Sequence, residues 1–149
     1  MKAQLAWQQG MEFACENHGI KTSIDATKEH GGTDKGPSPK DLVLNAMMGC
    51  TAMDVVAILN KMRQPLVRFA MEIEVEKTLE HPVHFKTALL VFFVEGPVAP
   101  DKLLKAVEVS LTRYCGVNYM ISRSCDISYR VNLNGALVGT GKARFAGDQ

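Results

Sequence analysis

Cysteine is the residue type in this sequence with the clearest chemical use. The 149-residue chain contains four, Cys15, Cys50, Cys115 and Cys125, and none forms the C-x-x-C pair typical of zinc or thioredoxin chemistry. A thiolate attacks peroxides and disulfides, whereas a protonated buried thiol packs as a small hydrophobic group. Cys50 and Cys115 fall in segments with helical patterning, so they are the candidate reactive residues, and we assign Cys15 and Cys125 to packing.

Other residue types offer no comparable site. The four histidines, His18, His30, His81 and His84, lie in turns or at strand starts, without the spacing of metal ligands or of a serine triad. The stretch 30–37 is rich in glycine but lacks the Gly-Lys-Ser/Thr ending of a phosphate-binding loop, and we interpret it as a flexible surface loop. The sequence therefore predicts no bound metal, nucleotide or other cofactor.

A first helix, from Pro39 to about Met62, must position Cys50. This cysteine lies about 17 Å from the helix start at about 1.5 Å per residue, so the helix dipole, which acts mainly within the first turn, does not make it a thiolate. Asp54, one turn later, is a negative neighbour that disfavours a second negative charge, and a cation would have to come from elsewhere. Two interpretations stay open, a reactive thiol or a packing residue beside Gly49. Asp54 also has two interpretations. It either orients a partner residue or pairs with a buried cation, or it faces a solvent-filled gap between elements.

A second helix, opened by Pro100, carries Cys115 at its end. Gly116 follows directly and is typical of a helix stop. Arg113, two positions before Cys115, points to another side of a helix. Cys115 is therefore either a reactive thiol or a residue that packs the helix end.

The remaining pattern predicts an α+β fold. Ser38 and Asp41 are spaced to form a capping box at the start of the first helix. The alternating segments predict strands at Ala3–Trp7, Met11–Cys15 and Ile20–Ile24, a hairpin from Val67–Glu76 and His84–Glu95, and a closing hairpin from Ser128 to Val138 around Asn134-Gly135. We expect one domain over residues 1–149, with antiparallel or mixed sheets around two central helices and a disordered tail at 145–149.

Composition narrows the classes of partner and location. Lys and Arg number 17 against 16 for Asp and Glu, and this net charge of +1 argues against nucleic acid as a partner. The N-terminus lacks the apolar core of a secretory signal, which favours the cytoplasm. The apolar run from Leu42 to Leu59 approaches the length of a membrane span, but Asn45, Gly49 and Asp54 interrupt it, so we predict a core helix and no membrane association.

Three segments of the sequence form a recognisable combination: Gly36-Pro37-Ser38-Pro39-Lys40-Asp41-Leu42, Met48-Gly49-Cys50-Thr51-Ala52-Met53-Asp54-Val55-Val56 and, well downstream, Tyr114-Cys115. Together they resemble the OsmC/Ohr family of osmotically inducible and organic hydroperoxide resistance proteins, most closely its YhfA-like branch. The order of predicted elements also fits over nearly the whole chain.

The resemblance implies an intertwined homodimer with two cysteine sites at the subunit interface. It also implies a reaction, in which Cys50 attacks an organic hydroperoxide or hydrogen peroxide and becomes a sulfenic acid. Cys115 then resolves the sulfenic acid as a disulfide, and a dithiol reductant, a lipoyl protein or a thioredoxin-like protein, restores both thiols. The implied role is peroxidase activity in oxidative or osmotic stress defence.

The chain departs from the family at two positions. The peroxidases that it resembles activate the thiolate with an arginine and a glutamate. The glutamate position falls on Lys40, and the arginine position falls near Met11, which leaves Lys21, Lys40 or Arg113 to supply positive charge. Two alternatives therefore stand beside a peroxidase: a non-catalytic dimeric stress or ligand-binding protein of the same fold, and a redox sensor without rapid turnover.

Overall fold

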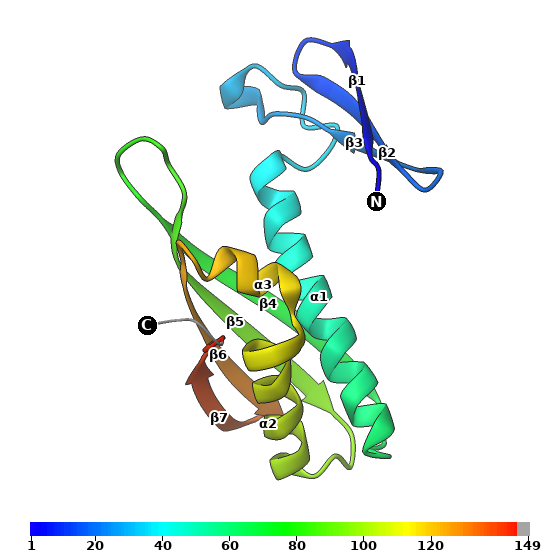
Figure 1. Ribbon diagram of the computed structural model, residues 1–149, viewed down its shortest axis with the longest axis vertical. Coiled ribbons are helices and arrows are strands. Elements are labelled where there is room, and N and C mark those ends of the chain that lie inside the picture. The colour runs from blue at the N-terminus through cyan, green and yellow to red at the C-terminus, as the bar shows by residue number, and fades with distance from the viewer. Residues whose placement is uncertain (146–149) are drawn as a thin grey trace. The chain divides into compact units, whose positions relative to one another are not determined.

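The computed structural model describes residues 1–145 and divides into two compact units, one up to Asn45 and the other from Ala46 onward (Figure 1). The single-domain organisation stays a prediction. The disordered tail expected at 145–149 lies outside the described residues except for Phe145. Phe145 is buried, and its ring packs edge-on against the ring of Tyr119, with 5.7 Å between the two ring centres.

The first unit opens with the predicted antiparallel meander. Its strands β1 (Gln4–Gln9), β2 (Glu12–Asn17) and β3 (Ile20–Ile24) pair in the order β1-β2-β3. The β2–β3 turn needs positive φ at two residues, His18 and Gly19, which adopt 53° and 81°. Alternating residue types in short segments were enough to predict these strands.

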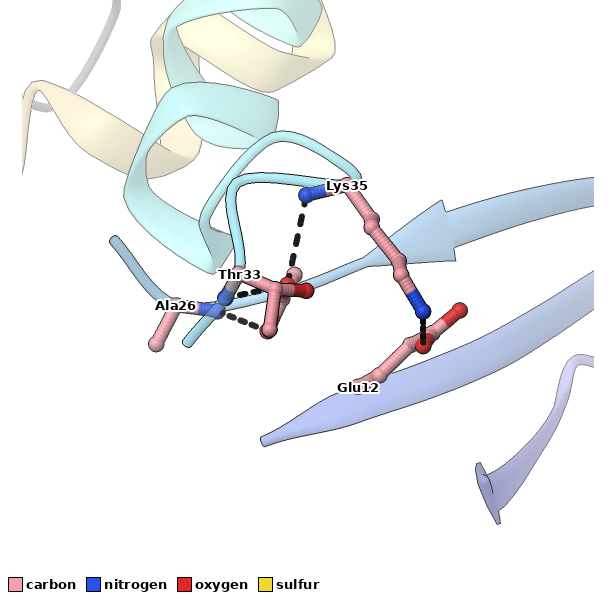
Figure 2. A network of polar contacts seen from close by, with 5 residues as sticks. Glu12, Ala26, Thr33 and Lys35 are labelled. Atoms are coloured by element: carbon pink, nitrogen blue, oxygen red, sulfur yellow. Dashed lines mark hydrogen bonds and ion pairs between the residues drawn. The ribbon is translucent and has the colours of Figure 1, made fainter. Parts of the chain in front are cut away.

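A buried carboxylate organises the loop that follows β3. Asp25 accepts hydrogen bonds from the backbone amide and hydroxyl of Thr33, at 2.9 and 2.8 Å, and from the amides of Ala26 and Lys35 at 2.8 and 3.2 Å (Figure 2). These donors lower the pKa of Asp25 to about 2, the bonds from Thr33 contributing most. The Lys35 ammonium reaches back to Glu12 of β2 at 2.9 Å. The loop is thus tied to the sheet through Lys35, and the flexibility expected of residues 30–37 stays a prediction.

The first helix, α1 (Pro39–Lys61), begins with the predicted capping box. The Ser38 amide donates to the Asp41 carboxylate at 2.9 Å, and the Asp41 amide donates to the Ser38 hydroxyl at 3.3 Å. In the described chain α1 is the one helix with the length and apolar composition of a membrane span, a test that core helices of soluble proteins also pass.

Only one stripe of α1 is buried within the single chain. It consists of Met47, Thr51, Val55 and Leu59, spaced four residues apart. The other apolar side chains of α1 are half-buried or exposed, and Met53, the most exposed of the large ones, is 75% exposed. The sequence predicts a helix covered on nearly every side, and the single chain supplies that cover on one side.

The second unit contains a four-stranded mixed sheet. Its strands are β4 (Arg68–Lys77), β5 (Phe85–Glu95), β6 (Asp126–Leu133) and β7 (Ala136–Lys142), in the order β4-β5-β6-β7. β4 and β7 pair antiparallel with their neighbours, while β5 and β6 are parallel. The predicted Asn134-Gly135 turn joins β6 to β7 with φ of 50° and 82°, as a two-residue hairpin of this type requires.

The parallel pair needs a crossover, and this crossover carries Cys115. It consists of α2 (Pro100–Val109), a π-helical turn η2 (Ser110–Tyr114) and α3 (Gly116–Ile121). The prediction that Gly116 stops a helix is wrong: Gly116 begins α3, and it does not adopt the positive φ of a glycine helix stop. α1 and α2 are both drawn in front of the sheet in Figure 1, and the Ser110 hydroxyl, directly after α2, donates to the Asp54 carboxylate of α1. The buried core includes Leu90, Phe92 and Val94 of β5.

Candidate functional site

Three chemically active groups converge where α1 meets the crossover. The sulfur atoms of Cys50 and Cys115 and a carboxylate oxygen of Asp54 all lie within 4.8 Å of one another. Cys50 and Asp54 come from adjacent turns of α1, and Cys115 comes from the junction between η2 and α3. The structure therefore brings together the two cysteines that the sequence singled out, far apart in the chain.

Helical spacing explains how α1 presents its two groups. Residues four apart lie one above the other on a helix, so Cys50 and Asp54 share a face next to the buried stripe through Thr51. Cys50 is half-buried. A methyl group added at Gly49 would meet no atom within 4 Å, so within this chain no other element approaches there, and the idea that Gly49 makes room beside Cys50 is not supported.

A change of helix type positions Cys115. The Cys115 amide donates to the Ser110 carbonyl at 2.9 Å, the five-residue step of a π turn, and the residue itself is extended, with φ of −69° and ψ of 93°. Its sulfur then accepts a hydrogen bond from the Asn118 amide at 3.4 Å and thereby caps α3. Cys115 is fully buried, and it both ends the π turn, as the sequence predicts for a helix end, and begins α3.

Thr51 and Asn118 form a polar pair behind Cys115 that sequence reasoning missed. The Asn118 side-chain amide donates to the Thr51 hydroxyl at 2.7 Å and to the Met47 carbonyl at 3.2 Å. Because the Thr51 oxygen accepts this bond, its own proton is free to point at the Cys115 sulfur, 3.5 Å away. Among the described residues nothing donates to the Asn118 side-chain oxygen, although the residue is fully buried. The only sequence signal was a threonine within an apolar helix.

Asp54 is oriented by the crossover. The buried Ser110 hydroxyl donates to one oxygen of the Asp54 carboxylate at 2.9 Å. Of the two interpretations of Asp54, the structure favours the one in which it is positioned by a partner, since the carboxylate is half-buried and hydrogen-bonded. The same π turn therefore places Ser110 against Asp54 and Cys115 against Thr51.

Burial keeps the proton on Cys115 at neutral pH. Loss of solvent raises the pKa of the Cys115 thiol to about 11, and Cys50 adds to this rise through a hydrogen bond and its charge, while Thr51 and Asn118 oppose it. None of these groups is a cation. Cys115 is therefore a thiol that can donate to Cys50, and Cys50 is the more exposed of the two cysteines.

The other residues considered from the sequence lie elsewhere or serve other contacts. Arg113 is exposed, and its guanidinium lies 5.6 Å from the centre of the Tyr114 ring. Lys21 and Lys40 belong to the first unit, Lys21 on β3 and Lys40 at the start of α1.

The two cysteines outside the cluster differ from each other. Cys125 is buried, as packing requires, and burial raises the pKa of its thiol. Cys15 is half-buried and donates to the Asn17 side chain at 3.3 Å, so its assignment to packing fits less well.

Fold and site together define a class of protein: an α+β chain with one cysteine on a long helix and a second cysteine in a crossover behind it. The family model described as OsmC-like protein matches residues 32–130, which includes both cysteines. The chain belongs to this OsmC/Ohr family. It is 34% identical over 131 residues to Protein YhfA of Escherichia coli K12, a match that covers 87% of this chain and 95% of that protein.

Solved structures share the fold. An OsmC-like protein from Mycoplasma pneumoniae superposes with a TM-score of 0.78 at 12% identity, covering 89% of this chain and 95% of that one. An organic hydroperoxide resistance protein from Elizabethkingia anophelis gives a TM-score of 0.66 at 14% identity, covering 89% and 94%. A structure from Legionella pneumophila, named both an organic hydroperoxide resistance protein and a predicted redox protein, gives 0.68 at 17% identity, covering 88% and 95%. At these identities the likeness establishes the α+β fold.

Proposed function

We propose that this protein is a thiol-dependent peroxidase that reduces organic hydroperoxides or hydrogen peroxide through a cycle between Cys50 and Cys115. The observation that carries the proposal is the placement of a half-buried sulfur, Cys50, within 4.8 Å of a fully buried one, Cys115. Support also comes from relatives of the same fold that are named organic hydroperoxide resistance proteins. The role would be defence against oxidative or osmotic stress.

The proposed cycle has three balanced steps. The Cys50 thiolate attacks the terminal oxygen of the hydroperoxide, the O–O bond breaks, and the alkoxide takes a proton and leaves as an alcohol, or as water from hydrogen peroxide. The Cys115 sulfur then attacks the Cys50 sulfenic acid, which forms the disulfide and releases water. A dithiol reductant, a lipoyl or thioredoxin-like protein, reduces this disulfide and is itself oxidised.

The hydrogen bonds around Cys115 suit it to the resolving role. A reductant would attack the more accessible Cys50 sulfur, so the Cys115 sulfur would leave as a thiolate in a buried place. Thr51 and the Asn118 amide aim donors at that sulfur and lower the cost of its negative charge. The leaving thiol of a disulfide departs faster when its pKa is lower, so these donors would speed reduction.

We further propose a homodimer in the cytoplasm. The uncovered apolar side chains of α1 and exposed Leu5 and Trp7, which share one face of β1, give a second copy of the chain large apolar surfaces to bury. The proposed cycle starts from free thiols at Cys50 and Cys115, the state that a reducing compartment such as the cytoplasm maintains.

Intact-mass spectrometry of reduced protein after one equivalent of cumene hydroperoxide tests the cycle. The expected result is rapid loss of two hydrogen atoms, mapped by peptide analysis to a Cys50–Cys115 disulfide. Cys115→Ser should stop at the sulfenic acid, Cys50→Ser should not react, and Cys125→Ser, the matched control, should behave as the unsubstituted protein. Full turnover by either Cys50→Ser or Cys115→Ser would exclude the cycle.

The charge of the cluster favours one alternative specifically. The carboxylate of Asp54 lies beside both sulfurs. The family resemblance puts the activating glutamate position at Lys40 and the activating arginine position near Met11. A negative neighbour and a missing activating pair favour the alternative of a non-catalytic dimeric stress or ligand-binding protein. For such a protein, the intact mass would stay unchanged after addition of cumene hydroperoxide. Slow oxidation without turnover would instead indicate a redox sensor.

A further inference from the structure

The cluster of Cys50, Asp54 and Cys115 has the composition and convergence of a metal site. Two cysteine sulfurs and a carboxylate oxygen, each from a half-buried or buried residue, lie within 4.8 Å of one another. We propose that the reduced protein binds one zinc ion per chain through these three groups. The inference concerns binding by reduced protein in the absence of peroxide, so it does not depend on peroxidase activity.

The ligand types select zinc over other common cations. Thiolates bind zinc well and bind magnesium or calcium poorly. An aspartate oxygen is also an established zinc ligand. Around a tetrahedral zinc with Zn–S bonds of about 2.3 Å, two sulfurs lie about 3.8 Å apart, a separation that the upper limit of 4.8 Å accommodates. Three protein ligands leave the fourth position for water, and half-buried Cys50 gives access to it.

Supporting hydrogen bonds are already in place for two of the three ligands. Ser110 donates to Asp54 and fixes the direction of the carboxylate, and both the Thr51 hydroxyl and the Asn118 amide donate to the Cys115 sulfur. Bonds of this kind orient metal ligands, and their loss typically lowers metal affinity about 10- to 100-fold. The cluster is therefore held in position before any metal arrives.

Zinc also balances the charge of the ligands that it would bind. In the metal-bound state two thiolates and one carboxylate would place three negative charges together, an arrangement that requires a cation between them. A zinc ion supplies two positive charges, and its binding displaces a proton from each thiol that is protonated beforehand. The sequence did not predict this site, because Cys50 and Asp54 are one helical turn apart and the third ligand comes from the distant crossover.

Titration of metal-free, reduced protein with zinc, followed by calorimetry and by competition with a chromogenic chelator, tests the proposal. The expected result is one zinc per chain. Cobalt as a probe should give the visible bands of a tetrahedral ion and a thiolate-to-cobalt charge-transfer band. Asp54→Asn keeps an oxygen that can accept from Ser110 and preserves the shape of the side chain, so it should fold normally and weaken zinc binding at least tenfold.

Variants of the cysteines complete the test. Cys50→Ser and Cys115→Ser should each lose the charge-transfer intensity of one thiolate, while Cys15→Ser and Cys125→Ser should bind zinc as the unsubstituted protein does. Unchanged zinc affinity in folded Asp54→Asn and in Cys50→Ser, or the absence of stoichiometric zinc binding, would overturn the proposal. Peroxide assays carried out with a chelator present test the proposed peroxidase separately, so either idea can fail alone.

One consequence rests on the proposed function. Because the same two sulfurs cannot form a disulfide and hold zinc at once, one equivalent of zinc should slow peroxide-driven disulfide formation, and oxidised protein should release its zinc. The zinc content of the protein would then report its redox state.

Discussion

At the residue scale, the two candidate cysteines have opposite environments although the sequence presents them alike. Cys50 is half-buried on the face of a helix, and Cys115 is buried with two hydrogen-bond donors aimed at its sulfur. This difference assigns the attacking role to the accessible sulfur and the resolving role to the buried one. It also makes Thr51 a positioning residue, since it acts through Cys115.

Replacing Thr51 with valine tests that positioning role. Thr51→Val keeps the shape of the side chain but removes the donor to Cys115 and the acceptor for Asn118, so reduction of the Cys50–Cys115 disulfide by dithiothreitol should slow severalfold. The buried Asn118 amide loses a partner, and the free energy of unfolding should fall by about 1–3 kcal/mol. Stopped-flow reduction and urea unfolding measure the two effects.

Thr51→Ser is the matched control, because it keeps the hydroxyl group. Its reduction rate should stay near that of the unsubstituted protein. If the disulfide of Thr51→Val is reduced as fast as the disulfide of Thr51→Ser, the hydroxyl group does not assist the departure of the Cys115 thiolate.

The pKa of Cys115 predicts a pH dependence of stability. Its folded-state value of about 11 lies above the ordinary 9.0, so between these values the folded protein holds a proton that the unfolded chain releases. The stability that this thiol contributes is complete below about pH 9 and falls as the pH rises toward 11. Unfolding of the reduced protein measured from pH 8 to 11 should show this loss. Cys115→Ser should lose less stability over the same interval, and identical slopes would contradict the assignment.

At the element scale, α1 carries the site and depends on its cap. The Ser38 and Asp41 groups satisfy amides at the first turn, and the helix then continues without interruption to Cys50 and Asp54. The crossover has the complementary task, because its π turn sets Ser110 and Cys115 against α1. The site is thus a contact between one regular helix and one irregular one.

Removing the cap should lower stability without changing the chemistry. Ser38→Ala loses the hydroxyl that accepts from the Asp41 amide, so the free energy of unfolding should fall by about 1 kcal/mol. Ser38→Thr retains a hydroxyl and serves as the control in urea unfolding. A loss of reactivity at Cys50 in Ser38→Ala, at temperatures where it is folded, would show that the cap reaches the site.

At the scale of the whole molecule, the single chain leaves much apolar surface uncovered. Met53 is 75% exposed on α1 and Trp7 is 66% exposed on β1, although both are types that proteins usually bury. A second copy of the chain would explain the all-round apolar character of α1 that the buried stripe alone does not.

A charge at Met53 tests this assembly. Met53→Glu should convert a dimer to a monomer, because a carboxylate would be buried without a partner at the interface. Leu79→Glu, at a 97% exposed position in the β4–β5 loop, is the control and should leave the assembly unchanged. Light scattering coupled to size-exclusion chromatography measures both masses. A monomeric unsubstituted protein, or a Met53→Glu protein that stays dimeric, would contradict the proposed interface.

Sequence patterns predicted most elements because the signals are local. Period-two alternation gave the strands, the Ser38–Asp41 spacing gave the start of α1, and Asn134-Gly135 gave the last hairpin. The error at Gly116 has a physical cause: a glycine after a helix usually stops it by adopting positive φ, but here the π turn ends in the extended residue Cys115, and α3 begins at the next residue. The parallel pairing of β5 and β6 also lay beyond local signals, since it depends on the whole crossover.

By itself the sequence determined the α+β fold class, the long apolar helix and the two cysteines worth attention, because these follow from spacing and side-chain type along short stretches. The family resemblance already implied that Cys50 and Cys115 meet, and the structure places them within 4.8 Å of each other. Only the tertiary structure decided that Asp54 joins them and that Thr51 and Asn118 lie behind the buried sulfur. The physical reason is that Cys50 and Cys115 lie on separate elements. Their distance, their burial and the donors aimed at them arise only when α1 packs against the crossover.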